Sequence, residues 1–286
     1  MVTISGKARL AGVLGWPIGH SRSPLLHNYW FERYRIDGVY IPLGVTPDDL
    51  AQVLRTLPKM GFAGVNVTLP HKQAILGLVD RVDPLAAAIG AVNTVLIDPD
   101  GRSTGLNTDG IGFLAHLAAS VPDWQERVRK VVLIGAGGAA RALAATFVRA
   151  GTAEICLVNR TLQRAEALLA RLDHKASSTS ARPWAERHAA LAGADLLVNT
   201  SSLGMTGQPP LDLALDHLPR EAIVADIVYV PLVTPLLDAA AARGHATVDG
   251  LGMLLHQAVP GFTHWGGRTP EVDAATRGMI ETTLTA

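Results

Sequence analysis

The sequence predicts an α/β protein of two domains, in which largely parallel sheets are covered by helices. Three observations support this fold class. Apolar runs of strand length alternate with Ala- and Leu-rich stretches of helical length along the chain. The 286 residues are enough for about two domains. The hydrophobic share of 48% against 17% charged residues predicts a folded globule and excludes a disordered chain.

The first hundred residues are expected to alternate strands with helices. Helix starts are indicated where Ser or Thr precedes Pro, at Ser23-Pro24 and at Thr46-Pro47. A further helix is expected to open at Pro70 and to carry Lys72 in its first turn. The strands of this region are expected at residues 11–14, 39–43, 64–68 and 92–97.

A second domain is expected to start shortly before residue 128. The continuous apolar run at 131–134 is typical of a buried parallel strand, and the helix that follows over 139–150 should end at Gly151. The Ser/Thr-rich segment 177–180 is expected to be a surface loop. The other strands are expected at residues 155–158, 195–199, 223–228 and 246–248, with a helix after Thr161.

Composition excludes several classes of function. Twenty-five basic residues balance 25 acidic ones, which removes an overall pull toward nucleic acid or anionic membranes, so any anion site must be local. A single cysteine, Cys156, cannot form an intramolecular disulfide or a Cys-rich zinc site. We therefore expect a protein of the reducing cytoplasm that has no metal site. Neither the run at 11–18 nor the stretch at 250–267 has the pattern of a signal peptide or a transmembrane helix.

A glycine-rich turn follows the strand at 131–134. Residues 135–140 fit the pattern G-x-G-x-x-A, between a strand and a helix, as the dinucleotide-binding unit of a Rossmann-type domain requires. Gly135 permits the tight turn, and Gly137 lets backbone N–H groups approach a pyrophosphate at the helix N-terminus. Tight packing alone is the alternative explanation. The candidate cofactor-binding residues of this turn are Gly135, Ala136, Gly137, Gly138 and Ala139.

The end of the next strand indicates which dinucleotide is bound. In NAD-binding units an Asp or Glu stands there, about 20 residues on, and accepts a hydrogen bond from the ribose 2′-OH. Here the strand ends Asn159-Arg160-Thr161, with no carboxylate, and Arg164 follows on the same face if a helix includes both arginines. Two guanidinium groups attract a 2′-phosphate. The pattern predicts NADP(H), with ordinary solvated charges as the alternative.

Two polar clusters in the first hundred residues are candidates for a substrate site. Ser21 and Ser23 stand just ahead of a helix start, where hydroxyl and N–H groups suit a small carboxylate, although plain helix capping by Ser23 is the alternative. Asn66 and Thr68 share one face of a strand, and Lys72 follows them, although a lone lysine is usually a surface residue.

Two further clusters, at 90–94 and 105–110, add Asn93 and Asp109, for which turn formation is the alternative. In order and spacing, all these motifs together closely resemble the shikimate dehydrogenases, the NADP-dependent enzymes of the aromatic amino-acid pathway. The resemblance runs from about residue 12 to the C-terminal region, with one departure at Val230, where the family often has Asn. It includes three more segments, 199–205, 226–231 and 250–257.

The resemblance implies a two-domain dehydrogenase that reversibly reduces 3-dehydroshikimate to shikimate with NADPH. It implies a substrate domain of residues 1–109 plus 250–286 and a Rossmann-type NADP-binding domain of residues 110–249, in a monomer or homodimer. Lys72 and Asp109 would form the catalytic pair, because the oxygen that receives the hydride's electrons must also gain a proton. The implied substrate-binding residues are Ser21, Ser23, Thr68, Asn93, Asp109, Tyr229 and Gln257. The implied cofactor-binding residues besides the turn are Asn159, Arg160, Thr161, Arg164, Thr200 and Gly250.

Two alternatives of different kinds remain open at this point. An NAD-dependent quinate/shikimate dehydrogenase, or an aminoshikimate relative, would carry the same glycines and the same Lys-Asp pair, so that Arg160 and Arg164 are what distinguishes them. A non-catalytic module that senses metabolites of the pathway is less favoured, because the catalytic motifs are complete and no basic face or fused DNA-binding segment is evident.

Overall fold

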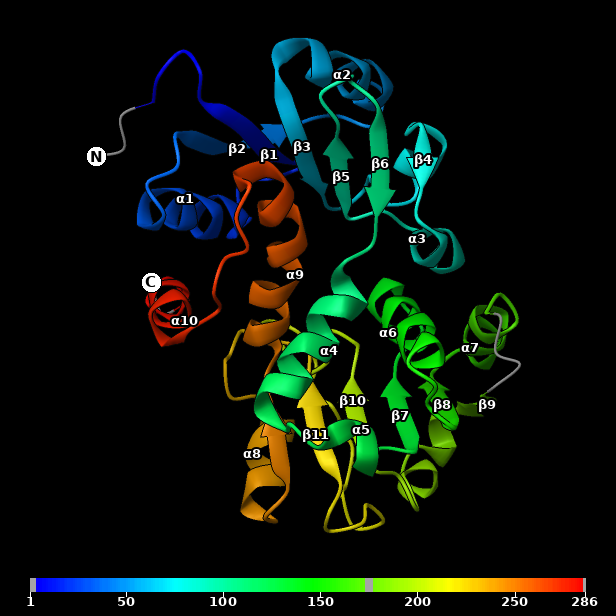
Figure 1. The fold of residues 1–286 in the computed structure, drawn as a ribbon. Helices are drawn as coiled ribbons and strands as arrows, with labels where there is room; N and C mark the ends of the chain where they lie inside the picture. Colours follow the sequence, from blue (N-terminus) through cyan, green and yellow to red (C-terminus); the bar gives the residue numbers. More distant parts are fainter. Residues whose placement is uncertain (1–3, 173–176, 285–286) are drawn as a thin grey trace. The chain divides into compact units, whose positions relative to one another are not determined.

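A computed structural model describes residues 4–172 and 177–284. The chain divides into two compact units: unit 1 comprises residues 1–108 with 257–286, and unit 2 comprises residues 109–256. Each unit contains a six-stranded sheet with helices, which confirms the predicted α/β class (Figure 1). The division places residue 109 and residues 250–256 in unit 2, whereas the predicted limits were 109/110 and 249/250.

Unit 1 is built on a mixed sheet. Its strands are β1 (Arg9–Gly15), β2 (Gly38–Gly44), β3 (Phe62–Val67), β4 (Arg81–Val82), β5 (Thr94–Ile97) and β6 (Ser103–Leu106). Its helices are α1 (Ser23–Arg33), α2 (Leu50–Thr56), α3 (Pro84–Ile89), α10 (Ala274–Glu281) and most of α9 (Gly250–Gly266), with 3₁₀ turns at Leu57–Met60 and Ala74–Gly77. The strand order is β2-β1-β3-β5-β6-β4, with β5 antiparallel to both β3 and β6.

The edge of this sheet at β2 is partly closed by a side chain. The Asn28 amide donates to the Tyr40 carbonyl oxygen and accepts from the Tyr40 N–H, each at 2.9 Å, as a neighbouring strand would. Pro42 has no N–H to offer two residues further on. Together these two residues protect an exposed edge against pairing with another chain.

Unit 2 is built on a fully parallel sheet in the described residues. Its strands are β7 (Lys130–Ile134), β8 (Glu154–Asn159), β9 (Ser178–Pro183), β10 (Leu196–Asn199), β11 (Ile223–Asp226) and β12 (Ala246–Val248). Its helices are α4 (Asp109–Ser120), α5 (Trp124–Arg127), α6 (Gly138–Arg149), α7 (Leu162–Leu169), α8 (Pro235–Ala242) and the start of α9, with 3₁₀ turns at Trp184–Glu186 and Ala189–Leu191. The order is β12-β11-β10-β7-β8-β9, and Figure 1 shows β8, β7, β10 and β11 side by side.

The sequence of the central strands explains their place in unit 2. Residues 131–134 of β7 and 155–158 of β8 are apolar and buried throughout, as strands covered by helices on both faces must be. Helix α6 ends as predicted, with Gly151 at a φ of +81°, in the left-handed region that glycine adopts without strain. The buried strands and their covering helices thus form a fixed support for the loops that follow the carboxyl ends of the strands.

Several predicted elements differ from the structure. Residues 178–183 form the edge strand β9 instead of a surface loop, because the backbone of a polar segment can still pair in parallel with β8. No helix opens at Pro70: residues 70–73 form turns ahead of the 3₁₀ turn at 74–77. The strand expected at 92–97 begins at Thr94, and the one expected at 223–228 ends at Asp226.

Candidate functional site

One end of the sheet in unit 1 brings together the segments that carry Ser21, Ser23, Thr68, Lys72 and Asn93. Strands β1 and β3 are parallel neighbours, so their carboxyl ends lie at the same edge. Strand β5 runs antiparallel to both β3 and β6, so that its first residue and the last residues of β6 reach that edge as well. Four segments that are distant in the sequence therefore meet there, as ligand sites of α/β sheets commonly require.

Ser21 and Ser23 occupy the segment that follows β1. Ser21 accepts a hydrogen bond from the Ser23 N–H through its Oγ at 3.3 Å, and its own N–H donates to the Ile18 carbonyl oxygen. Ser23 is the first residue of α1, whose N-cap position is occupied by Arg22 without a side-chain cap hydrogen bond. Plain capping by the Ser23 hydroxyl, the alternative considered above, is therefore wrong.

Thr68 and Lys72 follow β3 at the same edge. The Thr68 N–H donates to the Leu14 carbonyl oxygen of β1 at 2.9 Å, and the Thr68 carbonyl oxygen accepts from His71, which forms the first turn. Lys72 is half-buried in this turn, and its carbonyl oxygen accepts from the Val92 N–H at 2.8 Å. The backbone of Lys72 is thus tied to the segment that carries Asn93, although no helix carries it.

Asn93 is buried directly before β5. Only 2% of its surface is exposed, and its side-chain oxygen accepts from the Thr108 N–H at 2.8 Å. Thr108 is the last residue of unit 1 before the crossing into unit 2, and Asp109 follows it as the first residue of α4. The structure therefore brings Asn93 into direct contact with the residue that precedes Asp109 in the chain.

The glycine-rich turn of unit 2 has the geometry that a pyrophosphate site needs. Gly135 has a φ of +115°, which side chains rarely adopt, and an added methyl carbon would lie 3.0 Å from Thr200 Oγ1. Gly137 is the N-cap of α6, and no described side chain caps that helix. An added carbon at Gly137 or Gly138 meets no described atom within 4 Å, apart from local neighbours. The turn leaves open space in front of the helix N-terminus.

The position of this turn in the sheet agrees with a dinucleotide site. Strand β7 pairs with β8 on one side and with β10 on the other, so the chain order reverses between β7 and β10. Gly135 follows β7, and Thr200 follows β10 with its hydroxyl donating to the Ile134 carbonyl oxygen at 2.7 Å. Ligands of open parallel sheets bind at this reversal, beyond the carboxyl ends of the strands.

The predicted residues for the 2′-phosphate lie at the carboxyl end of β8. Arg160 and Arg164 are exposed, and no described carboxylate forms an ion pair with either. Helix α7 begins at Leu162 with Thr161 as its N-cap, so Arg160 precedes the helix and the two arginines do not share a helix face. The Asn159 amide donates to the Thr161 carbonyl oxygen at 2.8 Å and orders this bend. The residues present therefore fit an anionic group here.

The predicted role of Gly250 as a cofactor contact has a packing reason beside it. A methyl carbon at Gly250 would collide with the Ile227 carbonyl group and would lie 2.7 Å from the Val228 carbonyl oxygen. The start of α9 thus presses against the segment after β11, which also carries the half-buried Tyr229. The roles predicted for Asp109, Tyr229 and Gln257 toward the substrate stay predictions.

A buried polar pair at the ends of β10 and β11 was not predicted. Asn199 donates to Asp226 Oδ1 at 3.0 Å, and Asp226 also accepts from the Val228 N–H and the Thr234 hydroxyl. Burial raises the pKa of Asp226 to about 6, against the opposing effect of these hydrogen bonds. The pair ties together the segments after both strands. Its signal in the sequence is one polar residue ending each of two apolar strands.

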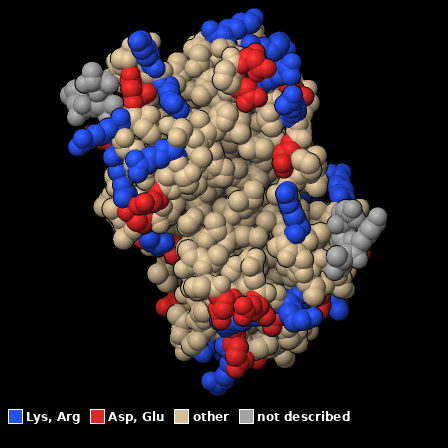
Figure 2. Space-filling model, in the orientation of Figure 1, with Lys and Arg blue, Asp and Glu red and all other residues tan. Residues whose placement is uncertain are grey.

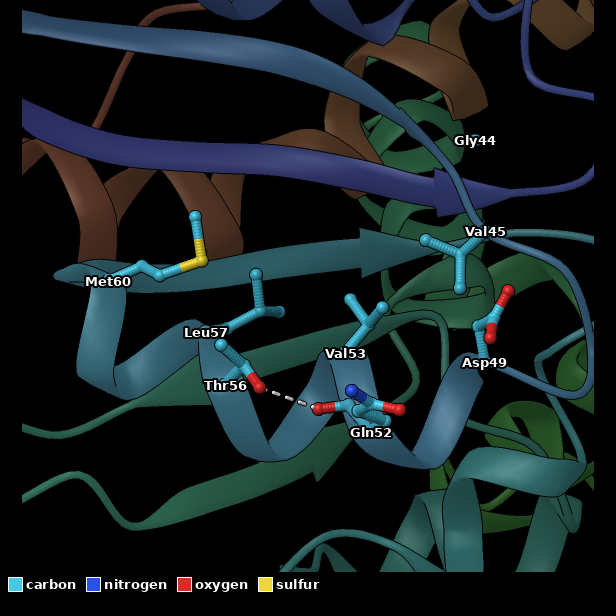
Figure 3. A pocket seen from close by; sticks show the side chains of 8 residues that line it. All are labelled: Gly44, Val45, Asp49, Gln52, Val53, Thr56, Leu57 and Met60. Atoms are coloured by element: carbon cyan, nitrogen blue, oxygen red, sulfur yellow. Dashed lines mark hydrogen bonds between the residues drawn. The ribbon is translucent and has the colours of Figure 1, made fainter.

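The rest of the described surface offers other features. In unit 1, hollows of about 340 and 530 Å³ lie beside β2 and α2; Figure 3 shows the smaller one, and neither is lined by a predicted site residue. Figure 2 shows basic and acidic side chains next to one another on the face in view. Within residues 4–172 and 177–284, no helix is long and apolar enough to cross a membrane, and no three His, Cys, Asp or Glu residues are placed to hold a metal ion.

Comparison with known proteins identifies the family. Residues 13–95 match the family model of the shikimate dehydrogenase substrate binding domain, and residues 116–206 match that of shikimate/quinate 5-dehydrogenase. The NADP(+) shikimate dehydrogenase of Paramagnetospirillum magneticum is 55% identical over 277 residues, which cover 97% of this chain and 99% of the relative. This chain belongs to the shikimate dehydrogenase family. The resemblance stated from the sequence motifs is confirmed.

Solved structures of the shikimate dehydrogenase family share the fold over almost the whole chain. The enzyme from Thermus thermophilus, solved with NADP(H) and shikimate, is 35% identical with a TM-score of 0.80, covering 97% of this chain and 98% of that one. The quinate dehydrogenase from Corynebacterium glutamicum, solved with NAD, is 32% identical with a TM-score of 0.88, covering 96% and 99%. Structural similarity therefore does not by itself separate the two cofactors or the two substrates.

Proposed function

We propose that this chain is an NADP-dependent shikimate dehydrogenase, which reversibly reduces 3-dehydroshikimate to shikimate in aromatic amino-acid biosynthesis. The observation that carries this proposal is that the segments carrying Ser21, Thr68, Lys72 and Asn93 meet at the same end of the sheet in unit 1. It is supported by the 55% identity to an NADP(+) shikimate dehydrogenase over nearly the full length.

The proposed chemistry is a proton transfer coupled to a hydride transfer. When bound, NADP(H) supplies or accepts the hydride at the substrate carbon. During reduction, the Lys72 ammonium donates a proton to the carbonyl oxygen as negative charge develops there, and during oxidation the neutral amine removes the hydroxyl proton. We assign Asp109 the task of orienting Lys72 and the reacting oxygen. Ser21 and Ser23, with Tyr229, hold the substrate carboxylate, while Thr68, Asn93, Asp109 and Gln257 contact the ring hydroxyls and the reacting oxygen.

The residues of unit 2 would hold the cofactor. The N–H groups at the start of α6 would donate hydrogen bonds to the pyrophosphate, since no described side chain caps them. Arg160 and Arg164 would bind the 2′-phosphate, with Asn159, Thr161, Thr200 and Gly250 around the nucleoside and nicotinamide parts. We further propose that the enzyme works in the cytoplasm, because its one cysteine is a buried free thiol. Size-exclusion chromatography distinguishes between the two predicted states, a monomer and a homodimer.

The direct test follows nicotinamide absorbance with shikimate or quinate, each with NADP⁺ or NAD⁺. The proposal predicts the highest kcat/KM with shikimate and NADP⁺. Activity only with quinate and NAD⁺ would overturn it in favour of the alternative enzyme, and absence of turnover with all four pairs would favour the metabolite sensor.

The preference for NADP depends on the arginines at the end of β8. Removing the guanidinium in Arg160→Ala should weaken NADPH binding about tenfold or more, since a charge-assisted hydrogen bond contributes about 1.5–3 kcal/mol, and should leave NADH binding unchanged. Arg171→Ala, which removes an equally exposed charge just after α7, is the matched control. An unchanged ratio of NADPH to NADH affinity in Arg160→Ala would count against the phosphate-binding role.

A further inference from the structure

The orientation of the Asn93 amide is fixed by the groups around its oxygen. The Thr108 N–H donates to Asn93 Oδ1 at 2.8 Å, and the hydroxyls of Thr108 and Thr94 lie 3.2 and 3.0 Å from the same atom. Because a backbone N–H can only donate, the atom that it meets must be the amide oxygen and not the nitrogen. The NH₂ group of Asn93 therefore points away from Thr94 and Thr108.

A second asparagine, Asn66, donates a hydrogen bond to the Thr94 hydroxyl. Asn66 donates through Nδ2 to Thr94 Oγ1 at 3.0 Å and to the Asn93 backbone carbonyl oxygen at 3.3 Å. Since the carbonyl oxygen can only accept, the orientation of the Asn66 amide is fixed as well. Thr94 Oγ1 thus accepts from Asn66, and its single hydrogen remains to be donated toward Asn93 or Thr108.

The chain of hydrogen bonds begins at a rigidly held tyrosine. The Tyr40 hydroxyl donates to Asn66 Oδ1 at 2.6 Å. Its ring stacks on the buried His27 with centroids 4.1 Å apart, and the Asn28 amide bonds both its backbone N–H and its carbonyl oxygen. Burial raises the pKa of Tyr40 well above its usual value and lowers the pKa of His27 to about 3, so near pH 7 Tyr40 is a donor beside a neutral ring.

Every residue of this hydrogen-bond network is buried and belongs to unit 1. Tyr40, Asn66, Thr94 and Asn93 are at most 6% exposed, and their donors and acceptors alternate in one direction. A buried network of this kind is costly if one member is left unsatisfied, so it holds a single arrangement. The hydrogen bonds that start at Tyr40 reach the side-chain oxygen of Asn93 through Asn66 and Thr94.

We propose that Tyr40 and Thr94 are positioning residues for Asn93, which they hold, through Asn66, with its NH₂ group toward the substrate as a fixed donor. The proposal rests on the function proposed above, in which Asn93 contacts a ring hydroxyl. A fixed donor requires an oxygen acceptor on the ligand and disfavours a protonated amine at the same position, because two donors would face each other. This hydrogen-bond network therefore selects a hydroxylated ring over its amino analogue.

The test is a double-mutant cycle on the full-length enzyme, with shikimate oxidation measured at saturating NADP⁺. Thr94→Val should lower kcat/KM about tenfold through the KM for shikimate, which corresponds to one hydrogen bond, with the KM for NADP⁺ unchanged. Thr94→Ser, which keeps the hydroxyl, should restore the activity. In an Asn93→Ala background, Thr94→Val should have less than a twofold further effect, since it acts through Asn93.

Two further variants control for structural damage. Thr104→Val changes a half-buried threonine of β6 that is not part of this hydrogen-bond network and should leave both KM values unchanged. Tyr40→Phe removes only a hydroxyl, keeps the stacked ring and should raise the KM for shikimate in the same manner, which provides the test if Thr94→Val does not fold.

The outcomes separate this inference from the proposed function. A wild-type enzyme that does not oxidise shikimate with NADP⁺ refutes the function. An active wild type in which Thr94→Val and Asn93→Ala have additive effects, or in which the KM for NADP⁺ rises as much as that for shikimate, refutes the positioning role alone.

Discussion

The two glycines of the turn after β7 should fail in different ways when a methyl group is added. Gly135 has a φ of +115°, so Gly135→Ala places a side chain in a strained backbone region and brings it 3.0 Å from Thr200 Oγ1. Such strain costs about 1–3 kcal/mol of folding stability. Gly137 has a φ of −89°, which alanine adopts freely, and no described atom beyond its chain neighbours lies within 4 Å of the added carbon.

The cost of Gly137→Ala should therefore appear in binding. Loss of glycine at an N-cap costs under about 1 kcal/mol of stability. A methyl group in front of the first N–H groups of α6, however, keeps a pyrophosphate oxygen from one charge-assisted hydrogen bond, which contributes about 1.5–3 kcal/mol. NADPH binding should weaken about 10- to 100-fold.

Two measurements on each variant separate these effects. Urea unfolding gives the free energy of unfolding, and a fluorescence titration with NADPH gives Kd. We expect Gly135→Ala to lose stability, and Gly137→Ala to keep it and lose affinity. The reasoning is refuted if Gly137→Ala binds NADPH within twofold of the wild type, or if it is as unstable as Gly135→Ala.

Two other predictions concern stability. The folded-state pKa of Asp226 is about 6, against an ordinary value of 3.8, so its contribution to stability is complete below about pH 4 and is lost as the pH rises through 6. Relative to Asp226→Asn, the wild type should therefore lose about 3 kcal/mol of unfolding free energy between pH 4 and pH 8. A difference in urea unfolding that does not depend on pH would contradict this. Gly110→Ala should cost about 1–3 kcal/mol, because its methyl carbon would collide with Thr146 of α6, whereas Gly278→Ala on α10, with open space around it, should gain about 0.5–1 kcal/mol; thermal unfolding that shifts both variants in one direction would be evidence against the packing argument.

The sequence was most informative where a function depends on local chemistry. The turn at Gly135 could be predicted because a strand, a spaced set of glycines and a helix start are contiguous in the chain. The same holds for the strand end at Arg160, where the missing carboxylate is visible directly. These features are short in sequence and carry their own geometry.

Local sequence patterns do not predict which strands pair with one another over long distances in the chain. Strand β6 pairs antiparallel with β5 and makes the sheet of unit 1 mixed, and β9 is a polar edge strand that only its partner β8 defines. The composition of residues 177–180 predicts a loop, but a backbone ladder can order a segment whose side chains show no apolar alternation, and the structure has a strand from Ser178.

The support of Asn93 was unpredictable for the same reason. Tyr40 and Asn66 are 26 residues apart, and Asn66 and Thr94 are 28 apart, so their hydrogen bonds exist only once the four strands β2, β1, β3 and β5 are in register. The sequence identified Asn93 through a family resemblance, but only the register of the sheet shows what holds its amide in place.

The kcat of Lys72→Ala with shikimate and NADP⁺ tests the central claim most directly, that Lys72 transfers the proton. General acid–base catalysis contributes about 10²- to 10⁴-fold, so kcat should fall by that factor while the Kd for NADPH stays unchanged. Lys59→Ala, which removes an exposed lysine of the same unit, is the control and should retain wild-type turnover. A Lys72→Ala enzyme whose kcat stays within threefold of the wild type would contradict the account.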